Sequence, residues 1–254
     1  MVNVNTVYQT VLLILNKEQR GYMTPQEFNN VAAQVQLQIF EQYFDDINQQ
    51  LRVPQADVDY ADRQMNIDEK ISIFKTSASL EYIQNYFQIP QSITDTYGDN
   101  VLFYRLGVVT HSNSYGNITE VERVNRTDFY NAQSTGLLKA TEEYPVYLYE
   151  DEKLFVSPST INQSNTISID FVKKPLNPLW GFTVGNRGQY VYSNSDYNPD
   201  VIPPTGSINF QLHPSEQTNL ILRILAYAGV IVKDPSIIQV ATQQVMQDEA
   251  NAKS

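Results

Sequence analysis

The stretch MTPQEFNNVAAQVQLQIFEQYFDDINQQL, residues 23–51, decides how the N-terminal part of the chain folds. Thr24 is a good N-cap, Pro25 suits the first helical position, and Glu27 stands where it completes a capping box. Apolar residues then recur at spacings of three and four, which predicts a long helix with one buried face. These residues are Phe28, Val31, Val35, Ile39, Phe40, Phe44, Ile47 and Leu51. Pro54 ends the helix, because proline cannot donate the backbone hydrogen bond.

Helical spacing also marks the segments that flank this long helix. Residues 5–16 form a first helix, which we expect to pair with the long helix as an antiparallel hairpin. Residues 55–74 form a third, shorter helix, whose early acidic residues suit the positive end of the helix dipole. Near the C-terminus, a helix opens at His213-Pro214 and a last helix starts near Asp234-Pro235.

The middle of the chain has the composition of β-strands. Runs rich in β-branched and aromatic residues are separated by Asp, Asn, Gly and Pro. The predicted strands are 79–89, 101–110, 118–124, 145–149, 153–156, 166–172 and, after a long interruption, 207–212. We expect a short helix at 128–133 capped by Thr127, and a hairpin whose tip is formed by residues 150–152.

The order of helices, strands and helices predicts an α+β fold. Terminal helices pack as a bundle in a domain of residues 1–75 and 207–254, and an antiparallel β domain, residues 76–206, is inserted between them. Within that domain, residues 174–205 read as a long loop, here called the arm. Its Pro and Gly punctuation combined with large aromatic residues predicts an interaction segment that reaches a partner. The aromatic residues are Trp180, Phe182, Tyr190, Tyr192 and Tyr197.

Composition excludes several classes of function. The 254 residues include no Cys, so disulfides, thiolate zinc sites and cysteine nucleophiles are excluded. The formal net charge of -11 disfavours binding to nucleic acid phosphates. The uncharged residues 2–16 are interrupted by Asn, Gln and Thr, unlike a membrane span or signal peptide. The 22 Asn and 23 Gln either serve wet protein contacts or reflect the source genome.

No motif predicts catalysis, a metal or a cofactor. His111 and His213 are far apart in the sequence and suit a turn and the start of a helix. Acidic clusters such as Glu142-Glu143 and Glu150-Asp151-Glu152 suit solvated surfaces better than an acid and base pair. A glycan hydrolase, the enzyme class considered, would need two carboxylates about 5 to 10 Å apart in a cleft. We therefore expect a protein that is not an enzyme.

Several segments resemble virion structural proteins of tailed bacteriophages, most closely the head-to-tail ring or adaptor proteins of crAss-like and related short-tailed phages. The N-terminal match is Asn16-Lys-Glu-Gln-Arg-Gly-Tyr-Met-Thr-Pro-Gln-Glu-Phe-Asn29 with the pattern at 34–41. Later matches are 145–149, 154–158, the run Ile169 to Trp180, and Leu212-His-Pro-Ser-Glu216. The resembling motifs are structural, and together they touch both ends and the middle of the chain.

This resemblance implies a passive mechanical part of the virion at the head-tail junction, made in the host bacterial cytoplasm. Such proteins form a homo-oligomeric ring, usually twelve-fold, between the portal protein and the tail ring or nozzle proteins, with DNA only as passing cargo. The alternative is another tail component, such as a tail tube, hub or fibre-attachment protein.

A second candidate interface is the apolar stripe of the last helix. Adaptors that resemble this chain use terminal extensions to climb onto the portal, whereas the alternative is that the stripe packs on its own bundle. The residues of the stripe are Ile237, Ile238, Val240, Val245 and Met246.

Overall fold

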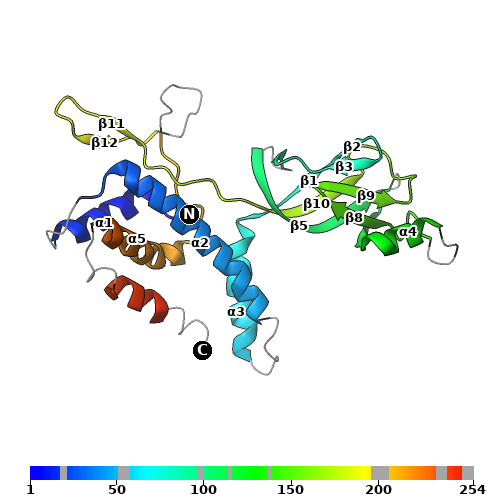
Figure 1. Ribbon diagram of the computed structural model, residues 1–254, viewed down its shortest axis with the longest axis horizontal. Helices are drawn as coiled ribbons and strands as arrows, with labels where there is room; N and C mark the ends of the chain where they lie inside the picture. The colour runs from blue at the N-terminus through cyan, green and yellow to red at the C-terminus, as the bar shows by residue number, and fades with distance from the viewer. Residues whose placement is uncertain are drawn as a thin grey trace. The chain divides into compact units, whose positions relative to one another are not determined.

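The computed structural model describes residues 1–17, 22–50, 58–95, 100–113, 116–134, 136, 139–195, 206–232 and 239–247 (Figure 1). It has the expected α+β composition of helices and mainly antiparallel sheets. The chain divides into two compact units, one of Met1–Ile73 with Pro175–Ser254 and the other of Phe74–Lys174. We call them the helical unit and the β unit.

The grouping of the arm differs from the sequence-based domain boundaries. Residues after Lys174 belong to the helical unit, whereas the sequence placed all of 174–205 with the β domain. The physical reason is a set of hydrogen bonds from this segment to the long helix, described below. The arm also contains regular structure, a hairpin of β11 (Phe182–Val184) and β12 (Tyr190–Tyr192). Tyr197 lies outside the described residues.

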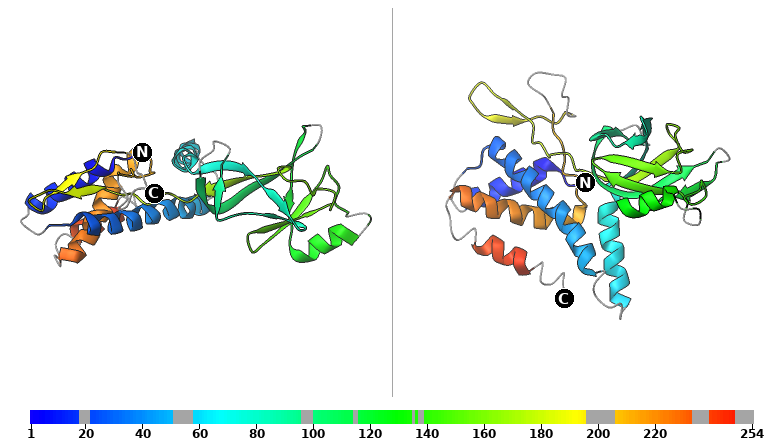
Figure 2. Two further views of the ribbon diagram at one scale, coloured as in Figure 1. Left: turned by 90° about the horizontal axis from the view of Figure 1, so that it is seen from above. Right: turned by 45° about the vertical axis from the view of Figure 1, so that its right-hand side comes forward.

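The helical unit is built around three helices that share one apolar interior. Helix α5 (Gln217–Val232) packs against both α1 (Val4–Lys17) and α2 (Pro25–Gln50) (Figure 2). Helix α3 (Val58–Ser72) packs on α2 and confirms the third predicted helix. The expected end of α2 at 51–54 lies outside the described residues. Fully buried residues of this interior include Val7, Val11, Leu15, Phe28, Val35, Ile39, Leu220, Ile224 and Ala228.

The capping box at the start of α2 is confirmed. The Thr24 amide donates to a carboxylate oxygen of Glu27 at 2.9 Å, and the Glu27 amide donates to the Thr24 hydroxyl at 3.3 Å. Hydrogen bonds from Thr24 hold the pKa of the Glu27 carboxyl below its ordinary value. The cap therefore contributes its full stability at a pH above the ordinary pKa of a glutamate, and it weakens as the pH falls and the carboxylate is protonated. The start of α2 is therefore fixed by local sequence.

An ion pair between a partly exposed lysine and a buried glutamate joins α3 to the start of α5. The Lys70 ammonium lies 2.6 Å from a carboxylate oxygen of Glu216, whose side chain is almost fully buried. The other carboxylate oxygen accepts from Asn219 at 3.1 Å. Glu216 ends the short 3-10 helix η1 (Pro214–Glu216), which is capped by the His213 ring as it accepts from the Ser215 amide. This use of His213 matches the predicted helix start.

The β unit consists of two five-stranded sheets. One has the order β1-β10-β5-β4 with β6 on β5, and the other β2-β3-β9-β8-β7. The pairing is antiparallel except between β7 and β8. The strands are β1 (Lys75–Ser79), β2 (Glu81–Ile83), β3 (Tyr86–Gln88), β4 (Ser92–Thr94), β5 (Asn100–Ser112), β6 (Ile118–Glu120), β7 (Glu122–Arg123), β8 (Val146–Glu150), β9 (Lys153–Ser157) and β10 (Ile167–Lys173). Both sheets contribute to one core that includes Phe87, Ile89, Leu154, Ile167, Ile169 and Phe171.

Two turns explain where the predicted strands were right and where they were wrong. The hairpin between β8 and β9 is confirmed, and Asp151 and Glu152 both have positive φ, as in the tight turns that match strand twist. The single strand predicted at 79–89 is wrong, because Gln84 and Asn85 also adopt positive φ and fold it into the β2–β3 hairpin. Gln-Asn is a weaker turn signal than Asn-Gly.

The strand predicted at 207–212 is also wrong. Only isolated bridges occur there, between Phe210 and Val2 and between Ile208 and Leu179. These residues pair with short irregular segments, so no sheet can extend from them.

The helix predicted at 128–133 exists as α4 (Arg126–Ser134), but its cap is not Thr127. The Asn125 side-chain oxygen accepts from the Asp128 amide at 2.9 Å, two residues earlier than the predicted cap. Asn ranks above Thr as an N-cap, so the helix begins directly after Asn125 and not after Thr127.

This cap gives a first test. Replacement of Asn125 by Ala should lower the free energy of unfolding by about 1 kcal/mol, because a helix amide loses its acceptor. Replacement of Thr127 by Ala is the matched control and should change it little, since Thr127 is exposed inside the first turn. Urea unfolding monitored by circular dichroism measures both values. Equal losses in the two variants would contradict the assignment.

Candidate interaction surface

Trp180 anchors the arm on the helical unit. Its indole N–H donates to the Asn5 side-chain oxygen at 3.0 Å, and its side chain is 5% exposed. The side-chain oxygen of Asn29 accepts from the Trp180 backbone N–H at 2.8 Å, and the side-chain nitrogen of Asn29 donates to the Trp180 carbonyl at 3.3 Å. One asparagine thus supplies both hydrogen bonds that a neighbouring strand would supply. Trp180, predicted as a partner contact, is buried within its own chain.

An aromatic cluster surrounds the Trp180 ring. Tyr8 lies 4.5 Å from it between ring centroids, and Tyr192 and Phe182 stack on it at 5.5 and 6.0 Å. The Tyr8 hydroxyl donates to the Met23 carbonyl at 3.0 Å, and burial raises the pKa of the Tyr8 phenol well above its usual range. The Tyr8 hydroxyl therefore stays a neutral donor at all physiological pH values. The cluster fixes the base of the hairpin against α1.

Two glycines shape the hairpin. At its base, a Cβ on Gly181 would lie 1.9 Å from the carbonyl oxygen of Gly206, so only glycine allows the two chain segments to meet. At its tip, the Gly185 amide donates to the Gln189 carbonyl at 2.8 Å, and Gly188 turns the chain with a φ of 78°. The hairpin therefore has a closed base and a tight tip.

A second set of amide hydrogen bonds holds the start of the arm beside Gln211, which follows the arm in the sequence. Gln36 of α2, 1% exposed, donates to the Leu176 carbonyl at 2.7 Å and accepts from the Gln211 amide at 2.9 Å. The Gln211 side chain in turn accepts from the Leu176 amide at 2.9 Å. A buried glutamine thus satisfies backbone groups that no sheet or helix would satisfy.

Beyond its base, the hairpin exposes apolar side chains. Val184 is 63% exposed, Val191 47% and Tyr190 40%, whereas Phe182 and Tyr192 are half-buried. Figure 1 shows β11 and β12 extending away from the helices of their unit. Among the described aromatic residues that were expected to contact a partner, Tyr190 is the most exposed. The sequence did not predict the two exposed valines as contact residues.

The last helix contributes a smaller apolar surface. Residues 239–247 are helical, with Ala241 buried, Val245 half-buried, and Val240 and Met246 exposed. Ile237 and Ile238 lie outside the described residues. The buried Ala241 shows that one side of this helix is covered by the chain itself, while the other side remains open.

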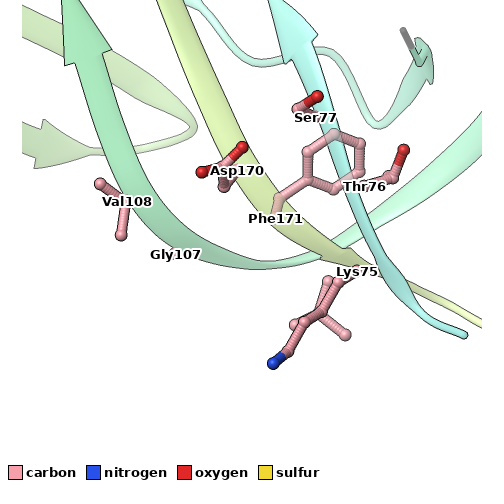
Figure 3. A pocket seen from close by; sticks show the side chains of 8 residues that line it. Lys75, Thr76, Ser77, Gly107, Val108, Asp170 and Phe171 are labelled. Carbon is pink, nitrogen blue, oxygen red and sulfur yellow. The ribbon is translucent and has the colours of Figure 1, made fainter. Parts of the chain in front are cut away.

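One hollow of the β unit, of about 490 Å³, is lined by residues of β1, β5 and β10 (Figure 3). Its polar lining comes from residues such as Lys75, Ser77 and Asp170, with Gly107 and Val108 opposite. A Cβ on Gly107 would lie 2.8 Å from the Asp170 carbonyl oxygen, which explains the glycine at this register shift. The side chains shown in Figure 3 point in different directions.

The residues weighed for catalysis have structural surroundings. His111 is buried in β5, and burial lowers the pKa of its ring. Within the described part of the chain its Nδ1 has no hydrogen-bond partner. Arg126 pairs with Glu150 at 2.5 Å, and Lys153 pairs with Asp151 at 2.9 Å. Across the described residues, no group of three or more His, Asp and Glu side chains is placed to hold a metal ion.

The same part of the chain contains no helix that is both long and apolar enough to cross a membrane. No protein-family model matches the sequence, and no curated protein matches it. The candidate site is therefore defined by its own geometry, as an anchored hairpin with an exposed apolar end.

The anchor gives a second test. Replacement of Asn29 by Ala should lower the free energy of unfolding by about 1 to 3 kcal/mol, because the backbone N–H and C=O of Trp180 lose their partners. Trp180 is the only tryptophan, so its fluorescence should also shift towards that of an exposed indole. Replacement of the adjacent, exposed Asn30 by Ala is the control. An unshifted spectrum in the Asn29 variant would contradict the anchoring role.

Proposed function

We propose that this chain is a virion structural protein of a tailed bacteriophage that forms a head-to-tail adaptor ring between the portal and the tail. The observation that carries the proposal is the combination of the sequence resemblance with a hairpin whose base is anchored and whose apolar end is exposed. A subunit of a ring needs a rigid element that offers surface to a neighbour. The role is mechanical and requires no catalytic centre.

Three of the segments that carry the resemblance also contribute to the framework of the helical unit. The N-terminal match contains the Thr24 capping box, the run from Ile169 ends at the anchored Trp180, and the last match contains His213 and Glu216 at the start of α5. Such residues are expected to persist in a structural family, because each satisfies a buried or terminal backbone group.

The charge of the chain also supports the proposal. With 28 acidic against 17 basic residues, the protein repels the phosphates of DNA, which a channel must let slide past. The exposed apolar residues of the 239–247 helix offer a second contact, which we assign to the portal.

The direct test is electron microscopy of the purified chain with the portal protein of the same virion. We expect a closed ring of this chain, with the twelve-fold symmetry of the portal, bound to the tail side of the portal. The chain alone and the portal alone serve as controls. Failure to bind the portal, or density at the tail tube or fibres of the intact particle, would contradict the adaptor role.

The C-terminal helix has its own test. Truncation after Asp234 should abolish portal binding and leave the melting temperature nearly unchanged. In the full-length chain, replacement of the exposed Val240 and Met246 by Asp should weaken portal binding in the same direction, because the helix stays while its apolar contact is lost. A large drop in melting temperature with portal binding retained would place the helix in the core instead.

A further inference from the structure

We propose that the β11–β12 hairpin binds a second copy of this chain, as the contact by which the protein self-associates. This inference deepens the proposed function, because in an adaptor ring the second copy would be the neighbouring subunit. Four observations support it: the open strand edges, the exposed apolar residues, the anchored base and the charge of the segment.

The first observation is that the hairpin is an incomplete sheet. It has two strands of three residues each, and within the described residues neither outer edge pairs with a third strand. A two-stranded ribbon is marginal in water, and natural proteins protect open edges with short strands, charged residues or proline. Neither β11 nor β12 contains a charge or a proline. These edges are therefore suited to pairing with another chain.

The second observation is the distribution of apolar residues on the two faces. Phe182 and Tyr192 are directly paired, and both stack on Trp180. The next pair on the same face, Val184 and Tyr190, is exposed, although the Tyr190 ring also packs edge-on against Phe182 at 5.0 Å. Val191 is exposed on the opposite face. The outer half of the ribbon thus presents apolar surface on both faces, which is costly in water unless a partner covers it.

The third observation is that the base of the hairpin is held firmly. The Ser207 hydroxyl accepts from the Gly181 amide at 3.0 Å and donates to the Ser193 carbonyl at 2.7 Å, and the Ser193 amide donates to the Gly181 carbonyl at 2.9 Å. Together with the Asn5 and Asn29 contacts, these bonds stop the ribbon from folding down to cover its own apolar end. A preorganised element loses little entropy on binding.

The fourth observation identifies the partner. Residues 175–195 contain no Asp or Glu, and Arg187 at the tip is their only charged residue. All 28 acidic residues of the chain lie elsewhere, so a second copy offers a surface of opposite sign to this tip. A single arginine is too little to hold a nucleic acid, which needs clustered positive charge. The partner that fits is an acidic protein surface with strand or apolar contacts, and the chain itself supplies one.

The experiment compares self-association of the purified chain and two double variants by sedimentation velocity and native mass spectrometry, without any portal protein. Replacement of Val184 and Val191 by Asp should weaken self-association at least tenfold. The matched control replaces Leu13 and Ile118 by Asp, two exposed apolar residues outside the hairpin, and should associate normally. Trp180 fluorescence should be unchanged in all variants, which shows that the base of the hairpin is intact.

A cross-linking experiment identifies the occupant. Because the chain has no cysteine, a single cysteine in place of Thr183 accepts one photo-reactive maleimide at a defined place. Illumination of the purified chain should give a covalent dimer, and mass spectrometry of the linked peptides should place the label on an acidic surface of the other copy. Arg187→Glu should reduce the yield most strongly at low salt.

The outcomes separate this inference from the adaptor role. If the chain stays monomeric at all accessible concentrations, or if the hairpin double variant associates normally, the hairpin inference is wrong. Self-association through the hairpin without portal binding would leave the inference standing and contradict the adaptor role. If the double variant binds the portal and forms normal rings, the adaptor role is supported and the hairpin inference is contradicted.

Discussion

The hydrogen bonds that Asn5 and Asn29 make to Trp180 are the constraint on which the arrangement of the helical unit depends. They attach an irregular segment to α1 and α2 without a strand or helix to support it. Buried backbone groups must find partners, and here the side-chain amides of a helix provide them. The tryptophan ring then fills the space between Tyr8 and the hairpin, so polar and apolar contacts fix the same residue.

The amide-rich composition gains a physical meaning from these contacts. Along α2, Asn29 and Gln36 bind the backbone of the arm, while Gln38 contacts Tyr227 and Gln42 contacts Arg223 of α5. Amides carry both a donor and an acceptor and need no counter-charge when they are buried. They therefore allow one helix to hold two unlike neighbours, a regular helix and an irregular chain. At least part of the Asn and Gln content serves the inside of the molecule.

The arrangement separates rigid and open parts of the helical unit. The base of the hairpin is fixed by Trp180 and Gly181, and its end leaves Val184 and Val191 in solvent. Of the residues considered for chemistry, His213 caps η1, and Glu150 and Asp151 form ion pairs with Arg126 and Lys153. This separation of a fixed base from an exposed end is the basis of the assembly role proposed above.

Sequence alone determined the elements whose signals are local. The capping box at Thr24 and Glu27, the hairpin at 150–152 and the apolar stripe of α5 follow from spacing and turn chemistry, which act over a few residues. Only the tertiary structure decided the place of the arm, because Asn29 and Gln36, which bind Trp180 and Leu176, are more than a hundred residues away in the sequence. The sequence also did not predict that Trp180 is buried and Val184 exposed, because an aromatic or apolar residue in a loop gives the same local pattern whether it is buried or exposed. Long-range hydrogen bonds and packing, which no local pattern encodes, separate the anchor from the surface it presents.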